Sequence, residues 1–187
     1  SLDNNTTGSS NIGIGYEALY SNTTGDKNVS IGVKSLYSNT TGNYSTAIGF
    51  ESQKNINSTG YNNSNSVWNT SFGYQALLGN TSNTPTCHTN TAIGAYTLKN
   101  IVNGNNNIAL GQYALQALTT GHRNTALGYR TLESNISGGN NVAVGEGALM
   151  NTTSSNNTAI GFHALISNVG GPSNTAVGYE SLEINSS

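Results

Sequence analysis

A five-residue unit recurs ten times along this chain and dictates its architecture. The unit reads Asn, a β-branched residue, a small residue, an aliphatic or Phe residue, and Gly, with Ser45 replacing Asn in the third copy. The glycines that close the units, called core glycines below, are Gly15, Gly32, Gly49, Gly73, Gly94, Gly111, Gly128, Gly145, Gly161 and Gly178. Seven of their nine intervals lie within one residue of 17. Such fixed-period self-similarity is typical of repeat proteins.

Two further patterns follow the same period. Leu stands four residues after every core glycine, preceded by Ala, Ser or Thr, except in the third unit, where Gln53 replaces it. A turn of the Asn-Thr-Thr-Gly type then closes most units, ending at Gly25, Gly42, Gly60, Gly104, Gly121, Gly138 and Gly171. Three features in one period make the repeat assignment secure.

The period itself predicts the fold. Seventeen residues are too few for a pair of helices but suffice for a short strand, a return segment and two turns. One such coil cannot bury its own apolar residues, so successive coils must stack. We therefore predict an all-β, parallel β-solenoid (a β-roll) of ten coils, about 50 Å long at about 4.8 Å per strand. It forms a single repeat domain over residues 1–187, with irregular longer coils at 50–94.

The unit also predicts how each strand is used. Its second and fourth residues share one strand face and its third occupies the other, so we expect an aliphatic ladder on one face and close backbone approach on the other. The leading Asn residues, stacked at one level, are expected to form side-chain amide ladders. The glycines of the closing turns are expected to supply the positive φ values that a tight reversal of the chain needs. The segment from glycine to leucine is either a second strand or one helical turn.

Composition excludes several functions. Only 7% of residues are charged, the net charge is −2, and the six basic residues are scattered, so no nucleic-acid partner is expected. A single cysteine allows no disulfide within the chain. No 18-residue apolar run is present, so we expect no membrane insertion by this segment. Because the chain opens on the tail of a repeat, residues 5–8, we expect it to be a segment truncated at both ends.

No catalytic or metal constellation is expected. Glu17, Glu51 and Glu180 share one offset from their core glycines but lie on separate coils, which favours surface charges. His88 adjoins Cys87, yet two further metal ligands are not evident. With no clustered acids, bases or nucleophiles, the sequence predicts a protein that is not an enzyme and holds no cofactor.

Two insertions form the candidate ligand-binding bulge. The coil between Gly49 and Gly73 contains seven extra residues and includes Tyr61 and the only tryptophan, Trp68, while the next carries four around Cys87 and His88. Solenoid insertions usually emerge as loops on one face, often the binding face. The alternatives are a tolerated loop, or a Trp68 that fills a core gap at Gln53.

Aromatic residues recur directly after the core glycine. They are Tyr16, Phe50, Tyr74, Tyr129, Phe162 and Tyr179. Rings at one level along a rod either stack on sugars or pack as a hydrophobic spine between subunits, and we favour the spine. Because two large apolar residues per coil make a thin core, such a second apolar surface is expected.

The runs 124–129 and 157–165 resemble head repeats of trimeric autotransporter adhesins, and more closely the related repeats of phage-tail-like and bacterial surface fibres. The resemblance covers residues 11–182, although the autotransporter period is shorter. It implies a left-handed β-roll, a homotrimer, an extracellular place on a cell or virion surface, and attachment to a host or prey receptor or glycan. The alternative is an ice-binding β-solenoid, for which Thr occupies the second position in only six of ten units.

Overall fold

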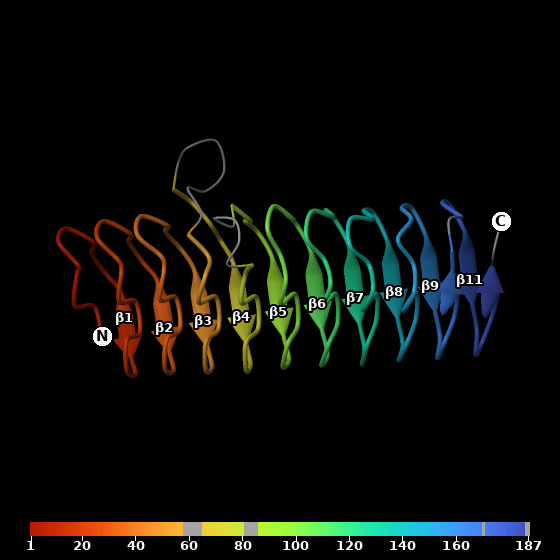
Figure 1. The fold of residues 1–187 in the computed structure, drawn as a ribbon, viewed down its shortest axis with the longest axis horizontal. Helices are drawn as coiled ribbons and strands as arrows, with labels where there is room; N and C mark the ends of the chain where they lie inside the picture. Colours follow the sequence, from red (N-terminus) through yellow and green to blue (C-terminus); the bar gives the residue numbers. More distant parts are fainter. Residues whose placement is uncertain (58–64, 81–85, 170, 186–187) are drawn as a thin grey trace.

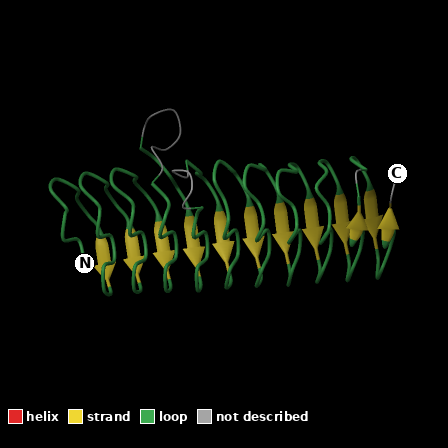
Figure 2. Ribbon diagram, in the orientation of Figure 1, coloured by secondary structure: helices red, strands yellow, loops and turns green. Residues whose placement is uncertain are grey.

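The computed structural model describes residues 1–57, 65–80, 86–169 and 171–185. It is a parallel β-solenoid in which one short strand per coil joins a ten-stranded sheet that runs along a rod (Figure 1). The two termini lie at opposite ends of the rod. Within these ranges every element is a strand or a loop, and none is a helix (Figure 2). The predicted fold class is confirmed.

The ten strands coincide with the middle three residues of the ten units. They are β1 (Ile12–Ile14), β2 (Val29–Ile31), β3 (Thr46–Ile48), β4 (Thr70–Phe72), β5 (Thr91–Ile93), β6 (Ile108–Leu110), β7 (Thr125–Leu127), β8 (Val142–Val144), β9 (Thr158–Ile160) and β11 (Thr175–Val177). Every neighbouring pair is parallel and in register, so that Ala92, for example, pairs with Ala109. The 24- and 21-residue intervals leave this register intact, because Ala47 still pairs with Ser71 and Ser71 with Ala92.

The segment from core glycine to leucine is neither of the two elements considered. It forms a turn in every coil. A second, two-stranded sheet does occur near the C-terminus, where β10 (Ser167–Asn168) pairs in parallel with β12 (Ile184–Asn185), but it lies beyond the leucine.

The orientation of the strands is the main surprise of the fold. The small third residue points inward and is fully buried from β2 to β9, whereas the aliphatic fourth residue points outward. Leu110, for example, is 44% exposed and Ile160 is 42% exposed. Of the two apolar residues expected to fill each coil, therefore, only the leucine does so. Leucines from Leu19 to Leu165 are buried and face the Ala and Ser side chains of the sheet.

Positive φ is also distributed differently from the prediction. The core glycines have φ between 119° and 140°. The closing-turn glycines within the described ranges do not have positive φ. At Gly121 the constraint is space, because a Cβ atom would lie 2.4 Å from the carbonyl oxygen of Gly138 in the next coil. The left-handed positions are instead taken by ordinary residues, including each core leucine, such as Leu115 at 52°. That backbone conformation turns the leucine side chain into the core.

The predicted amide ladder is present and buried. In the middle coils the Oδ1 of each leading Asn accepts the backbone N–H of the next, at 2.9 Å from Asn107 to Asn90 and 3.0 Å from Asn124 to Asn107. The Nδ2 donates to a carbonyl of the closing turn that follows in the same coil, as from Asn107 to Gly121 at 3.0 Å. These bonds satisfy polar groups that a thin core would otherwise leave unpaired.

The third coil interrupts this order at two points. Ser45 takes the Asn position and Gln53 the Leu position, and both are buried. The hydroxyl oxygen of Ser45 and the Oε1 of Gln53 have no hydrogen-bond partner among the described residues. Gln53 also divides the core leucines, because Leu19 and Leu36 form one buried cluster and Leu77 begins the other.

Candidate functional site

Two adjoining hollows form a shallow groove on the side of the rod where the chain enters each strand. One, of about 280 Å³, is lined by Trp68, His88, Thr89 and Asn106. The other, of about 260 Å³, is lined by His88, Asn105, Asn106, His122 and Arg123. Because His88 and Asn106 line both, we treat them as one feature, the Trp68–Arg123 groove.

The groove residues come from the two positions before each leading Asn. The residue directly before the Asn has a left-handed backbone, with φ of 48° at Trp68, 59° at Asn106 and 57° at Arg123. This conformation points successive side chains out of the rod at one level, one strand spacing apart. From Trp68 to Arg123 there are three spacings, about 14 Å.

The residue two before the Asn is held by a ladder of its own. The backbone N–H of His88 donates to Asn105 Oδ1 at 2.8 Å, and the backbone N–H of Asn105 donates to His122 Nδ1 at 3.0 Å. Since Nδ1 of His122 accepts, its ring proton lies on Nε2 in this arrangement. The floor of the groove is therefore fixed by backbone-to-side-chain bonds.

The groove has a positive bias. None of its lining residues is acidic. Partial burial, with a smaller contribution from His122, lowers the pKa of His88, which therefore stays neutral near pH 7 and presents hydrogen-bonding nitrogens. Arg123 is exposed and carries the charge.

Arg123 also differs from the other basic side chains. Lys34, Lys54 and Arg130 form ion pairs with Glu17, Glu51 and Glu133. Lys27 and Lys99 lie over the rings of Tyr44 and Tyr96. Arg123 alone among the six has neither an ion pair nor a ring contact with any described residue.

The structure separates the residues of the predicted bulge. Trp68 and His88 line the same hollow. Cys87 is fully buried in the apolar core and cannot reach a ligand at the surface. Tyr61 lies outside the described residues. The groove adds Asn106, His122 and Arg123, which the sequence reading missed because they belong to regular coils; their shared offset before the leading Asn was the available signal.

Trp68 does not fill a gap at Gln53. Its side chain is 48% exposed and stacks on Tyr44 of the preceding coil, with ring centroids 6.3 Å apart. Gln53 fills its own position, and its Nε2 donates to the carbonyl of Thr46 at 2.9 Å. The indole therefore packs against Tyr44 and also borders the groove.

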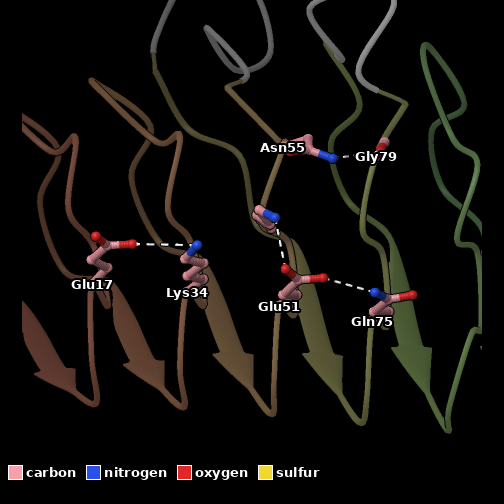
Figure 3. A network of polar contacts seen from close by, with 7 residues as sticks. Glu17, Lys34, Glu51, Asn55, Gln75 and Gly79 are labelled. Atoms are coloured by element: carbon pink, nitrogen blue, oxygen red, sulfur yellow. Dashed lines mark hydrogen bonds and ion pairs between the residues drawn. The ribbon is translucent and has the colours of Figure 1, made fainter.

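The carboxylates after the core glycines form a surface row rather than a catalytic pair. Lys34 lies between coils one and three, 3.6 Å from Glu17, and Glu51 accepts from Lys54 and Gln75 at 2.7 Å each (Figure 3). Partial burial opposes ionisation of Glu51, but these two hydrogen bonds outweigh it and lower the pKa of its carboxyl group. The row bonds one coil to the next.

Four of the six aromatic residues that follow the core glycines form two stacked pairs. Phe50 and Tyr74 have centroids 5.3 Å apart at 7°, and Phe162 and Tyr179 have centroids 5.3 Å apart at 10°. Tyr96, one position further along its coil, extends the first run with an edge contact to Tyr74. In the stacked pairs the facing ring surfaces cover one another, which disfavours sugar stacking at those positions.

The outer face of the ten-stranded sheet is strongly apolar. We use this name for the second and fourth residues of the ten sheet strands. Nine of its apolar side chains are between 37% and 66% exposed: Ile12, Ile14, Phe72, Ile93, Ile108, Leu110, Val142, Ile160 and Val177. A contiguous apolar surface of this kind marks an interaction site in a water-soluble protein.

Comparisons of the chain with protein-family models, with curated proteins and with solved structures gave no match. Among the described residues, no helix is long and apolar enough to span a bilayer, and no group of three or more His, Cys, Asp or Glu side chains is placed to hold a metal ion.

Proposed function

We propose that this chain is a non-catalytic segment of an extracellular fibre that assembles as a homotrimer and serves attachment. The observation that carries the proposal is the outer face, an apolar ladder exposed along the whole rod. The core accepts only one or two large apolar side chains in most coils, so much of the apolar surface of the chain lies outside it. Association of identical chains removes that surface from water.

The size of the outer face fits a stable interface. Ten strands of three residues span roughly 50 Å by 10 Å, a flat footprint of about 500 Å². Protruding side chains expose more area than the flat footprint, and the adjoining aromatic column widens it. The total approaches the ~800 Å² that each partner contributes to a typical stable interface. A second copy is the natural occupant, because it presents the same repeat at the same spacing.

The charge pattern supports the same assignment. The outer face carries Thr, aliphatic residues and Phe72, and no charged residue. The ion pairs of Lys34 and Arg130 lie after the core glycines instead. Depletion of charge at the centre and charge towards the edge is the usual arrangement of a subunit interface.

An attachment role follows from the shape. A rigid rod with repeated coils holds a tip away from a surface, and three copies of a weak site multiply affinity without new contacts. A cell-surface receptor or glycan is the expected partner.

Light scattering after size-exclusion chromatography tests the assembly. We expect three times the chain mass of 19.4 kDa. Leu110→Asp should lower the mass, because it buries a charge in the interface. Ile136→Asp, at an exposed position in a closing turn, is the matched control and should leave the mass unchanged. A wild-type monomer would overturn the trimeric fibre.

Ice binding is a second candidate, favoured by one observation. Thr46, Thr70 and Thr91 pair in register on the outer face, which forms a flat in-register array. Thermal hysteresis in a solution of the purified chain tests it. A freezing point equal to the melting point eliminates this candidate.

A further inference from the structure

We infer that the Trp68–Arg123 groove binds an acidic, carboxylate-bearing oligosaccharide. This inference rests on the proposed attachment function and names the ligand class and the residues that recognise it. Arg123 binds the carboxylate, Trp68 packs against an apolar sugar face, and Asn106 hydrogen-bonds the hydroxyl groups between them.

The charge of the groove residues indicates an acidic ligand. Five of the six basic side chains are engaged by a carboxylate or a ring of this chain, while Arg123 has neither among the described residues. It borders a hollow whose lining contains no carboxylate. A guanidinium presents paired donors that match the two oxygens of a carboxylate. An anion at this position therefore finds an unengaged partner and no like charge.

The other end of the groove supplies apolar contact. Trp68 is half-exposed and its orientation is fixed by stacking on Tyr44. A ring already held in place loses little conformational entropy when a ligand packs on it. The stacked pairs Phe50–Tyr74 and Phe162–Tyr179 offer less of this surface, because their facing rings cover one another.

The length between these ends requires more than one sugar unit. Trp68 and Arg123 stand three coils apart, about 14 Å. Thr89 and Asn106 occupy the same level on the two coils between them, and both are exposed. Their hydroxyl and amide groups donate and accept hydrogen bonds, which suits the hydroxyl groups of a saccharide.

The test compares trigalacturonic acid with the neutral galactose trisaccharide by isothermal titration calorimetry at low salt. We expect wild type to bind the acid at least about tenfold more tightly, with the preference shrinking as salt is raised. Arg123→Gln should abolish the preference. Arg130→Gln removes the same charge from another exposed arginine and should preserve it. A galactose trisaccharide bearing sulfate should bind more weakly than trigalacturonic acid.

Trp68→Asn tests the apolar end. Asn is tolerated at left-handed positions, as at Asn106, so the coil should keep its shape. The variant should weaken binding of the acidic and neutral sugars by a similar factor, because it removes contact and not charge. An unchanged assembly mass by light scattering and an unchanged thermal midpoint establish that each variant is folded.

The outcomes separate this inference from the proposed fibre. A trimer that binds neither sugar, or binds both equally, overturns the inference and leaves the fibre intact. Equal losses in Arg123→Gln and Arg130→Gln also overturn it, because they indicate a general charge effect. Tighter binding of the sulfated sugar would overturn the carboxylate assignment. A monomer that prefers the acid would overturn the fibre and support the groove.

Discussion

Asn90 bonds Asn107 twice: its Oδ1 accepts the backbone N–H of Asn107 at 2.9 Å and the Nδ2 of the same residue at 3.1 Å. Both residues are fully buried. The same pair of bonds recurs between Asn107 and Asn124. A row of amides thus links coil to coil inside a core that has few large apolar side chains.

The break in this row at Ser45 gives the first prediction. Asn28 accepts the backbone N–H of Ser45 and donates to the carbonyl of Gly42, but Ser45 offers only a hydroxyl group to the next coil. Ser45→Asn should supply an amide oxygen as acceptor for the backbone N–H of Asn69, as Asn28 does for Ser45. We expect a gain of about 1–2 kcal/mol in the free energy of unfolding, measured by denaturant titration. Asn28→Ser should cause a loss of similar size, and equal stabilities of the variants would contradict this role of the ladder.

Gln53 gives the second prediction. Its Oε1 is buried without a hydrogen-bond partner among the described residues, and it separates Leu36 from Leu77. Gln53→Leu should stabilise the chain by about 2 kcal/mol, because it removes an unpaired acceptor and joins the two apolar clusters. Gln53→Ala should be less stable than Gln53→Leu, since it leaves a cavity. If thermal unfolding ranks Gln53→Leu below wild type, the hydrogen bonds to Thr46 and Ser71 outweigh the apolar gain.

Thr89 gives the third prediction. It is exposed, and its φ of 58° is unfavourable for a β-branched residue. Asn occupies the equivalent position at Asn106, Asn140 and Asn156. Thr89→Asn should therefore raise the free energy of unfolding by about 0.5–1 kcal/mol. Thr91→Asn, in strand β5, is the control and should not stabilise, because Thr favours an extended backbone.

Asp26 gives a prediction about pH. The hydrogen bonds from the backbone N–H and the hydroxyl of Ser9, at 2.6 and 3.0 Å, lower the pKa of its carboxyl group. The pKa of Asp26 is lower in the folded state than in the unfolded state. The contribution of its carboxylate to the stability of the fold is therefore complete above the unfolded-state pKa and is lost as pH falls through the folded-state pKa. The protection factor of the Ser9 amide, its exchange rate relative to the intrinsic rate at the same pH, should then fall in acid.

Asp26→Asn is the matched variant for that titration. The equivalent position one coil later already carries Asn43, whose Oδ1 accepts the backbone N–H of Asp26 at 2.7 Å. The variant should keep the bond to Ser9 and remove its acid dependence. A Ser9 amide that exchanges at the same protection in acid and at neutral pH in wild type would refute the assignment.

Most residues of the groove could not be predicted from the sequence. The insertions drew attention to Trp68 and His88, which do share a hollow. Cys87 looked similar in the sequence, yet its position three residues before Asn90 is the one that closing-turn glycines take in other coils, and there it is buried. Arg123 could not be singled out from the sequence. What distinguishes it is the lack of an ion-pair or ring partner among the described residues, and such partners are known only once the coils are stacked.

The repeat, the parallel sheet and the Asn ladder follow from the amino-acid sequence alone, because stacking of equal coils places equal positions at one level. Which strand face lies inside became clear only from the folded coil. Because side chains alternate along a strand, Thr125 and Leu127 lie on one face and Ala126 lies on the other, but this alternation does not say which face points into the core. The left-handed leucines decide that, since Leu115 and Leu132 already fill the coil from the opposite side and leave room for Ala126 but not for Leu127. The larger aliphatic residues are therefore excluded from the core and form the outer face.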